Sequence, residues 1–117
     1  MTPTVLIVDD DADFRRLARQ MLASSGVEVI NEAATVGSAR VAAVELRPDA
    51  ALVDVCLPDG NGIDLARELA GLDWAPRIVL TSTDAGIVGD AADNGIVFVA
   101  KADLPSARLL DLLESPP

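Results

Sequence analysis

The sequence is poor in the residues that many functional sites depend on. Among its 117 residues there is no histidine and only one cysteine. The lack of histidine excludes histidine-based zinc sites, histidine general bases and a phosphohistidine intermediate within this chain. A single cysteine cannot form an internal disulfide, so we expect the protein to work in a reducing, cytoplasmic compartment.

Basic residues and long apolar runs are also scarce. The chain has 9 Lys and Arg against 19 Asp and Glu, which gives a formal net charge of −10 at pH 7. Such an anionic chain repels nucleic acid and anionic lipid, so the sequence predicts that it binds neither nucleic acid nor membrane. No apolar run approaches the ~18 residues of a membrane-spanning helix. The N-terminal stretch MTPTVLIVDDD has no basic region that would indicate a signal peptide.

Aromatic residues make up only 3% of the chain, although half of its residues are hydrophobic. Val, Leu, Ile and Ala therefore supply the apolar surface, which favours strands covered by helices on both faces. A length of 117 residues suits one compact domain, and no linker or repeat interrupts it. The sequence predicts a single domain over residues 1–117.

Five short apolar runs are predicted to be β-strands. Each is rich in β-branched residues and is bounded by Gly, Pro, Asp or Asn. They are Val5–Val8, Val27–Ile30, Ala50–Val55, Ile78–Leu80 and Ile96–Ala100.

Segments with helical spacing of apolar residues follow these runs. The clearest is amphipathic and ends before Gly26, the residue type that favours the position after a helix; its apolar residues are Phe14, Leu17, Ala18, Met21 and Leu22. The others lie at about 39–46, 65–72, 84–94 and 106–114, and the fourth is the weakest because it contains interior glycines. Five βα units in a row predict an α/β, doubly wound parallel sheet with strand order 2-1-3-4-5, the flavodoxin-like (βα)5 fold.

Polar side chains end four of the five predicted strands. Asp9 and Asp10 follow the first, Asp54 lies at the end of the third, Thr81 follows the fourth and Lys101 follows the fifth. Because the carboxyl ends of parallel strands meet at one edge of a sheet, we expect these groups to share a site. Close carboxylates with no histidine suit Mg²⁺, and one carboxylate could then attack a phosphoryl group. Thr81 and Lys101 could stabilise charge on the phosphoryl oxygens.

Four stretches in this order resemble the signature blocks of response-regulator receiver domains, similar to the chemotaxis regulators of two-component signalling. They are VLIVDDD, LVDVCLPDGNGIDL, IVLTS and VFVAK, and together they extend over nearly the whole chain. The resemblance implies that Asp54 is the phosphoacceptor and that Asp10 binds Mg²⁺ directly. It implies that Asp9 acts through water and that the backbone carbonyl of Cys56 completes the protein ligands.

The resemblance also implies a switch and a set of partners. Thr81 and Lys101 would bind phosphoryl oxygens, and Phe98 would be the aromatic residue that changes rotamer on activation. The face formed by residues 84–94, 96–100 and 106–114 would then change and could serve as a homodimer interface. The phosphoryl donor would be a histidine kinase or a phosphotransfer protein, and a downstream output domain or protein would receive the signal.

One further loop matches the family pattern, and one position departs from it. Pro58 and Gly62 match the loop that follows the acceptor in the family. The family commonly has a cis proline after the lysine of the last block, whereas this chain has Ala102. A cis peptide before alanine costs about 2.5–4 kcal/mol, so we expect a different geometry in that loop.

Two other functions fit parts of the sequence. Asp9 and Asp11 resemble the Asp-x-Asp pair of haloacid-dehalogenase-like phosphatases, although Ala12 follows where that family normally has Thr or Val. A receiver-like interaction module that takes no phosphate is the second. Asp11 also has a purely structural interpretation as a helix start, because carboxylates favour helix N-termini.

Overall fold

The computed structural model describes residues 3–83 and 96–101, which include a five-stranded sheet in the order β2-β1-β3-β6-β7. Its strands are β1 (Thr4–Val8), β2 (Glu28–Ala33), β3 (Ala50–Asp54), β6 (Arg77–Ser82) and β7 (Ile96–Ala100). All neighbouring pairs in this sheet are parallel. The predicted parallel α/β fold and its strand order 2-1-3-4-5 are confirmed.

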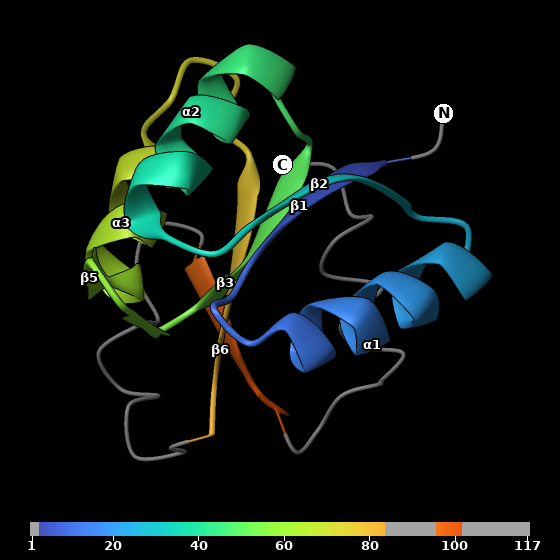
Figure 1. The fold of residues 1–117 in the computed structure, drawn as a ribbon. Helices are drawn as coiled ribbons and strands as arrows, with labels where there is room; N and C mark the ends of the chain where they lie inside the picture. Colours follow the sequence, from blue (N-terminus) through green and yellow to red (C-terminus); the bar gives the residue numbers. More distant parts are fainter. Residues whose placement is uncertain (1–2, 84–95, 102–117) are drawn as a thin grey trace.

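Helices cover both faces of the sheet. Helix α1 (Ala12–Ser24) lies on one face, and α2 (Val36–Leu46) and α3 (Gly62–Ala70) lie together on the other (Figure 1). The third predicted helix is too long at its C-terminal end, because α3 ends at Ala70 and Leu72 lies beyond it. The helices predicted at about 84–94 and 106–114, and the peptide before Ala102, lie outside the described residues.

Burial on both faces explains why the sheet strands are almost continuously apolar. Alternate residues of a strand point to opposite faces, and on β1 they enter two separate clusters. Leu6 and Val8 pack with residues of α2 and α3, whereas Val5 and Ile7 pack with Ala18 of α1. Every residue of β3 is buried. The sheet is therefore a layer between two cores, which holds its strand ends at fixed positions.

The helix ends follow local sequence chemistry. Asp11 is the N-cap of α1, where its side chain accepts hydrogen bonds from the backbone of Asp13 and Phe14. Gly26 follows this helix with a φ of 87°, so its predicted role at the helix end is confirmed. Helix α2 starts earlier than its alanine spacing predicted, because Thr35 caps it at Val36.

A short hairpin that the sequence did not predict follows the third sheet strand. It consists of β4 (Cys56–Leu57) and β5 (Gly60–Asn61). The Asp59 carboxylate at its turn accepts hydrogen bonds from the backbone N–H groups of Val36 (2.7 Å) and Gly37 (3.1 Å). These bonds lower the pKa of Asp59. The hairpin thus ties the end of β3 to the N-terminus of α2.

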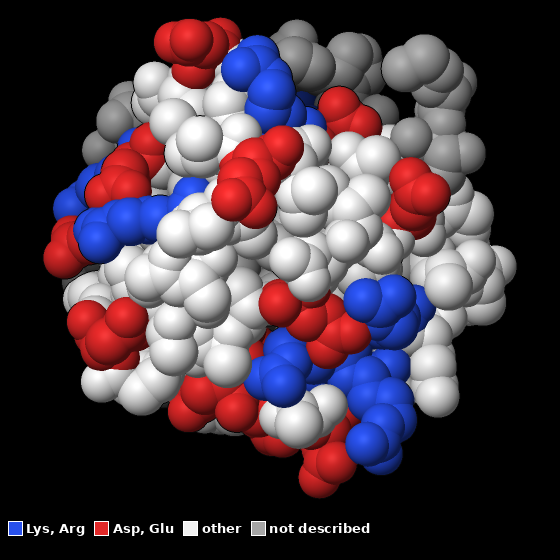
Figure 2. Space-filling model, turned by 45° about the horizontal axis from the view of Figure 1, so that its top comes forward, with Lys and Arg blue, Asp and Glu red and all other residues white. Residues whose placement is uncertain are grey.

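Charged side chains of both signs lie close together on the surface. Figure 2 shows one face, where lysine and arginine form small groups with acidic side chains beside them and uncharged areas between. This side therefore presents no continuous basic surface. None of the helices in the described part of the chain has the length and apolar character needed to cross a membrane.

Candidate functional site

Three carboxylates meet at the C-terminal ends of β1 and β3. Asp9 and Asp10 follow β1, Asp54 ends β3, and the two strands pair with Val8 opposite Val53. One carboxylate oxygen from each of the three aspartates lies within 4.8 Å of the others. The predicted meeting of these groups at one edge of the sheet is therefore present in the structure.

The three aspartates differ in exposure. Asp9 is fully buried, Asp54 is 7% exposed, and Asp10 is open to solvent. Asp10 is thus the carboxylate of the cluster that a hydrated ion reaches most easily. Asp11 is not in this cluster, because its carboxylate caps α1.

Hydrogen bonds hold Asp9 in place through its backbone and one carboxylate oxygen. Its N–H donates to the Ala33 carbonyl at 2.9 Å, and its Oδ1 accepts from the Asp11 N–H at 2.9 Å. Its own carbonyl accepts from Arg15 Nη1 at 2.6 Å. Asp9 therefore enters the site with its other oxygen, Oδ2.

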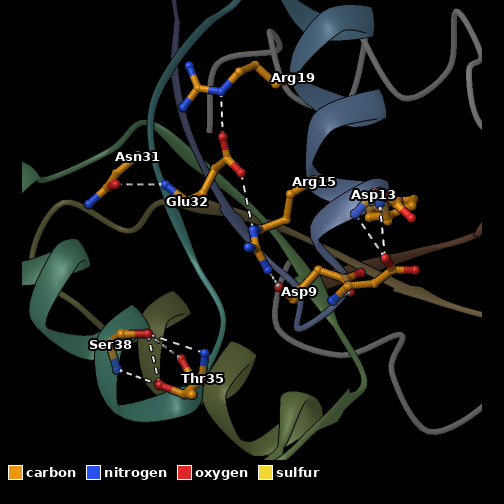
Figure 3. A network of polar contacts seen from close by, with 10 residues as sticks. Asp9, Asp13, Arg15, Arg19, Asn31, Glu32, Thr35 and Ser38 are labelled. Carbon is orange, nitrogen blue, oxygen red and sulfur yellow. Dashed lines mark hydrogen bonds and ion pairs between the residues drawn. The ribbon is translucent and has the colours of Figure 1, made fainter.

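Arg15 belongs to a supporting network that the sequence analysis missed. Figure 3 shows it between Glu32 on β2 and Asp9, with Arg19 on the far side of Glu32. The hydrogen bond from Arg19, with the charges of both arginines, outweighs desolvation and lowers the pKa of Glu32. Arg15 and Arg19 are four residues apart, so the sequence indicates that they share one face of α1. It does not indicate that Glu32 on β2 binds both of them, because that contact depends on how α1 packs on the sheet.

Lys101 provides the positive charge of the site. Its Nζ lies 2.8 Å from Asp9 Oδ2 and 3.7 Å from Asp54 Oδ2. It also lies 4.3 Å from the centre of the Phe14 ring, a cation–π contact that the sequence analysis did not predict. Burial tends to lower the pKa of Lys101, but the hydrogen bond and charge of Asp9, with the charge of Asp54, outweigh it and raise the pKa.

The surroundings of Asp54 disfavour its charged form, whereas those of Lys101 favour its charged form. Burial and the charge of Asp9 raise its pKa, although Lys101 and a 3.4 Å hydrogen bond from the Cys56 N–H act in the other direction. A site in which negative charge is disfavoured gains from an added cation. Cys56 itself is a free, exposed thiol at the start of β4.

Thr81 lies beside Asp54 across the pair of β3 and β6. The residue is fully buried, and among the described residues its Oγ1 has no hydrogen-bond partner. Leaving a buried hydroxyl unpaired costs about 1–3 kcal/mol, so Thr81 Oγ1 would gain from a hydrogen bond to a group bound beside Asp54. Phe98, the predicted switch aromatic, is on β7 opposite Leu80, and it is buried in the core cluster that faces α2 and α3.

Gly62 brings the start of α3 against the backbone of Asp54. Its N–H donates to the Val55 carbonyl at 2.7 Å. A Cβ at this position would lie 1.9 Å from the Asp54 carbonyl oxygen, so only glycine fits. Pro58 is exposed in the hairpin between these residues. The loop matched from sequence therefore sets the close approach of α3 to β3.

Comparison with known proteins gives a consistent result. The family described as response regulator receiver domain matches residues 5–112. Chemotaxis protein CheY of Thermotoga maritima is 35% identical over 116 residues, which covers 97% of this chain and 96% of that protein. Transcriptional regulatory protein PdtaR of Mycobacterium tuberculosis is 39% identical over 112 residues, or 94% of this chain and 54% of that protein. This chain thus spans about half the length of that relative.

A solved structure extends the similarity to three dimensions. The crystal structure of the CheX-CheY-BeF3-Mg complex from Borrelia burgdorferi contains a chain with a TM-score of 0.80 and 25% sequence identity. The match covers 93% of this chain and 84% of that one.

Proposed function

This chain belongs to the response regulator receiver domain family of two-component signalling, and from that premise we propose that Asp54 accepts a phosphoryl group in a Mg²⁺-dependent reaction. The observation that carries the proposal is the placement of Asp54 between the carboxylates of Asp9 and Asp10, the ammonium of Lys101 and the hydroxyl of Thr81. We take residues 1–117 as one receiver domain, since the family match extends over residues 5–112.

The donor set fits a divalent cation that prefers oxygen. Three carboxylates within 4.8 Å concentrate negative charge, and the raised pKa of Asp54 reflects part of that repulsion. Mg²⁺ prefers carboxylate and carbonyl oxygens and retains several waters. We propose that Asp10 and Asp54 bind it directly with the carbonyl of Cys56, and that Asp9 acts through water. When bound, the ion would neutralise charge on the carboxylates and on the phosphoryl oxygens.

The proposed transfer is an in-line displacement at phosphorus. An oxygen of the Asp54 carboxylate forms a bond to phosphorus while the bond from phosphorus to the donor nitrogen breaks. The electron pair of the broken bond stays with the histidine of the donor. The chain has no histidine, so the donor is a separate protein or domain, and we propose a histidine kinase or a phosphotransfer protein.

Two residues are placed to stabilise the transferred group. Lys101 can exchange its contact with Asp54 for one with a phosphoryl oxygen, because that contact is the longer of its two ion pairs. The buried hydroxyl of Thr81 can donate the hydrogen bond that it does not make to any described residue. Both act as preorganised donors where negative charge increases.

We further propose that phosphorylation is transmitted through β6 and β7 to an output domain or protein. Thr81 on β6 lies opposite Val99 of β7, and Phe98 is the residue that precedes Val99. If Thr81 moves towards a phosphoryl oxygen, the packing around Phe98 changes with it. The remainder of the proposed output and homodimer face lies outside the described residues.

The test is intact-protein mass spectrometry after incubation with acetyl phosphate and Mg²⁺. We expect one phosphoryl increment on the wild type, none without Mg²⁺ and none on Asp54→Asn. Asp64→Asn is the control, because it removes an exposed aspartate from α3 outside the site. An equal yield on Asp54→Asn would reject the assignment.

The same experiment tests one alternative, and a phosphoester hydrolysis assay tests the other. A phosphate-independent interaction module would show no increment under any condition. A haloacid-dehalogenase-like phosphatase would turn over a generic phosphoester, but the engagement of Asp11 as a helix cap argues against its Asp-x-Asp pair.

A further inference from the structure

Helix α2 leaves an apolar stripe uncovered on its outer side. Val41 and Val44 are 57% and 63% exposed, and with Arg40 and Glu45 they line an open groove. Its inner side is buried against the sheet. Most of the large hydrophobic residues exposed in the described part of the chain are on α2. Neighbouring exposed apolar side chains of this kind are a feature that protein–protein contact surfaces share.

The four groove residues have the spacing of a coiled-coil contact. In heptad terms, Val41 and Val44 occupy positions a and d, Arg40 occupies g, and Glu45 occupies e. When two such helices pack in parallel, the g residue of one lies beside the e residue of the other, five positions further on. A pair of α2 helices would therefore bring Arg40 of each copy to Glu45 of the other.

Both charged residues are available for this contact. Arg40 Nε is bonded to Glu68 Oε2 of α3 at 2.7 Å, but its side chain is 54% exposed and its guanidinium has further N–H donors. The contact with Glu68 therefore orients Arg40 at the rim of the groove without using all its donors. Glu45 is exposed and forms no ion pair with any described residue.

We propose that this groove is the contact surface for a second copy of the chain, with the two α2 helices packed in parallel about a two-fold axis. The argument for a second copy is that the groove carries both halves of a complementary charge pattern around an apolar centre. Helix α2 contacts β2 and β1, whereas β7 is at the opposite edge of the sheet. The proposed contact surface is therefore separate from the proposed output face, which includes β7. Association through it does not depend on phosphorylation.

The dimer should be weak. Helix α2 has 11 residues, so the helix pair is short, and contacts well below the usual interface size are transient. The net charge of −10 on each copy also opposes association. Salt near 0.15 M limits that repulsion, because the Debye length is then about 8 Å.

The first test is sedimentation velocity over a wide concentration range, with the unphosphorylated full chain. We expect the average mass of the wild type to rise with concentration and Val44→Glu to remain a single chain. Leu17→Glu is the matched control, because Leu17 on α1 is also exposed (55%) and receives the same added charge. A wild type that stays a single chain, or an association that survives Val44→Glu, would overturn the proposal.

The second test uses reversed charges. Glu45→Arg alone should weaken association, because it places arginine opposite Arg40. Arg40→Glu with Glu68→Arg keeps the intrachain pair in reversed form and should also weaken it. Mixing these two proteins should restore association, because both intermolecular contacts then join opposite charges. A mixture that associates no better than its components would overturn the parallel arrangement.

Discussion

The ammonium of Lys101 and the buried carboxylate of Asp9 form the shortest ion pair of the site, at 2.8 Å between Nζ and Oδ2. The corresponding distance to Asp54 is 3.7 Å. From the sequence we expected Lys101 to bind the oxygens of a phosphoryl group on Asp54, which requires a contact close to Asp54. The structure makes that contact the secondary one, which leaves Asp54 with less compensation and helps explain its raised pKa.

Removal of Lys101 should destabilise the folded protein, because the buried carboxylate of Asp9 then has no positive partner among the described residues. We expect Lys101→Met to destabilise the protein by about 3–5 kcal/mol, the usual cost of leaving one partner of a buried ion pair. The double variant Asp9→Asn with Lys101→Met should recover part of that loss, because it removes the unpaired charge. Urea unfolding of the wild type, the single variants Asp9→Asn and Lys101→Met, and the double variant measures the coupling. Strictly additive effects would contradict the pairing.

The raised pKa of Asp54 predicts a pH-dependent stability. Because its folded pKa lies above the unfolded value of 3.8, its ionisation costs stability as the pH rises through the folded pKa. Asp54→Asn should therefore increase the melting temperature at neutral pH without Mg²⁺. The gain should shrink below pH 3.8, where both folded and unfolded carboxyls are protonated. A gain that is constant with pH would indicate a cause other than ionisation.

Mg²⁺ should stabilise the folded chain in proportion to its binding. Thermal unfolding in a Mg²⁺ titration should show a rise in melting temperature that Asp10→Ala largely removes. Asp11→Ala is the control: it should lower stability by about 1 kcal/mol through loss of the helix cap, but leave the Mg²⁺ response unchanged. Equal losses of response in both variants would reverse the assignment of the two acids.

Gly62 should tolerate no side chain. A Cβ would lie 1.9 Å from the Asp54 carbonyl oxygen, so α3 or β3 must shift in Gly62→Ala. We expect a loss of at least about 1–3 kcal/mol, the usual cost of overpacking, together with slower phosphorylation of Asp54. Gly37→Ala is the control, because a Cβ at this position would have Asp59 Oδ2 as its nearest neighbour, at an ordinary contact distance of 3.7 Å. It should be neutral or stabilising by up to about 1 kcal/mol.

The carboxylate of Asp59 should support the N-terminus of α2. Asp59→Asn should lower the melting temperature, because a neutral amide is a weaker acceptor for the Val36 and Gly37 N–H groups. The lowered folded pKa means that this support is present above pH 3.8 and disappears as the pH falls through the folded pKa. The difference between the two proteins should therefore close in acid, and a difference that persists there would contradict this role.

Much of the site could be predicted because its members end strands. Asp9, Asp54 and Thr81 lie at or next to the last residues of β1, β3 and β6, and parallel pairing brings such residues to one edge. Phe14 was assigned to the core from its helical spacing, and no local pattern indicated that it would also contact Lys101.

The sequence by itself determined the fold class, because burial on both faces requires runs such as Leu52 and Val53 that are visible without coordinates. It also determined which acidic residues could meet, because parallel strands all end at the same edge of the sheet. Only the tertiary structure decided that Lys101 lies nearer to Asp9 than to Asp54, and that the Asp59 carboxylate binds the N-terminus of α2. The physical reason is that periodicity reports which side of an element is buried. Distances between side chains depend on how separate elements pack, and no local pattern records them.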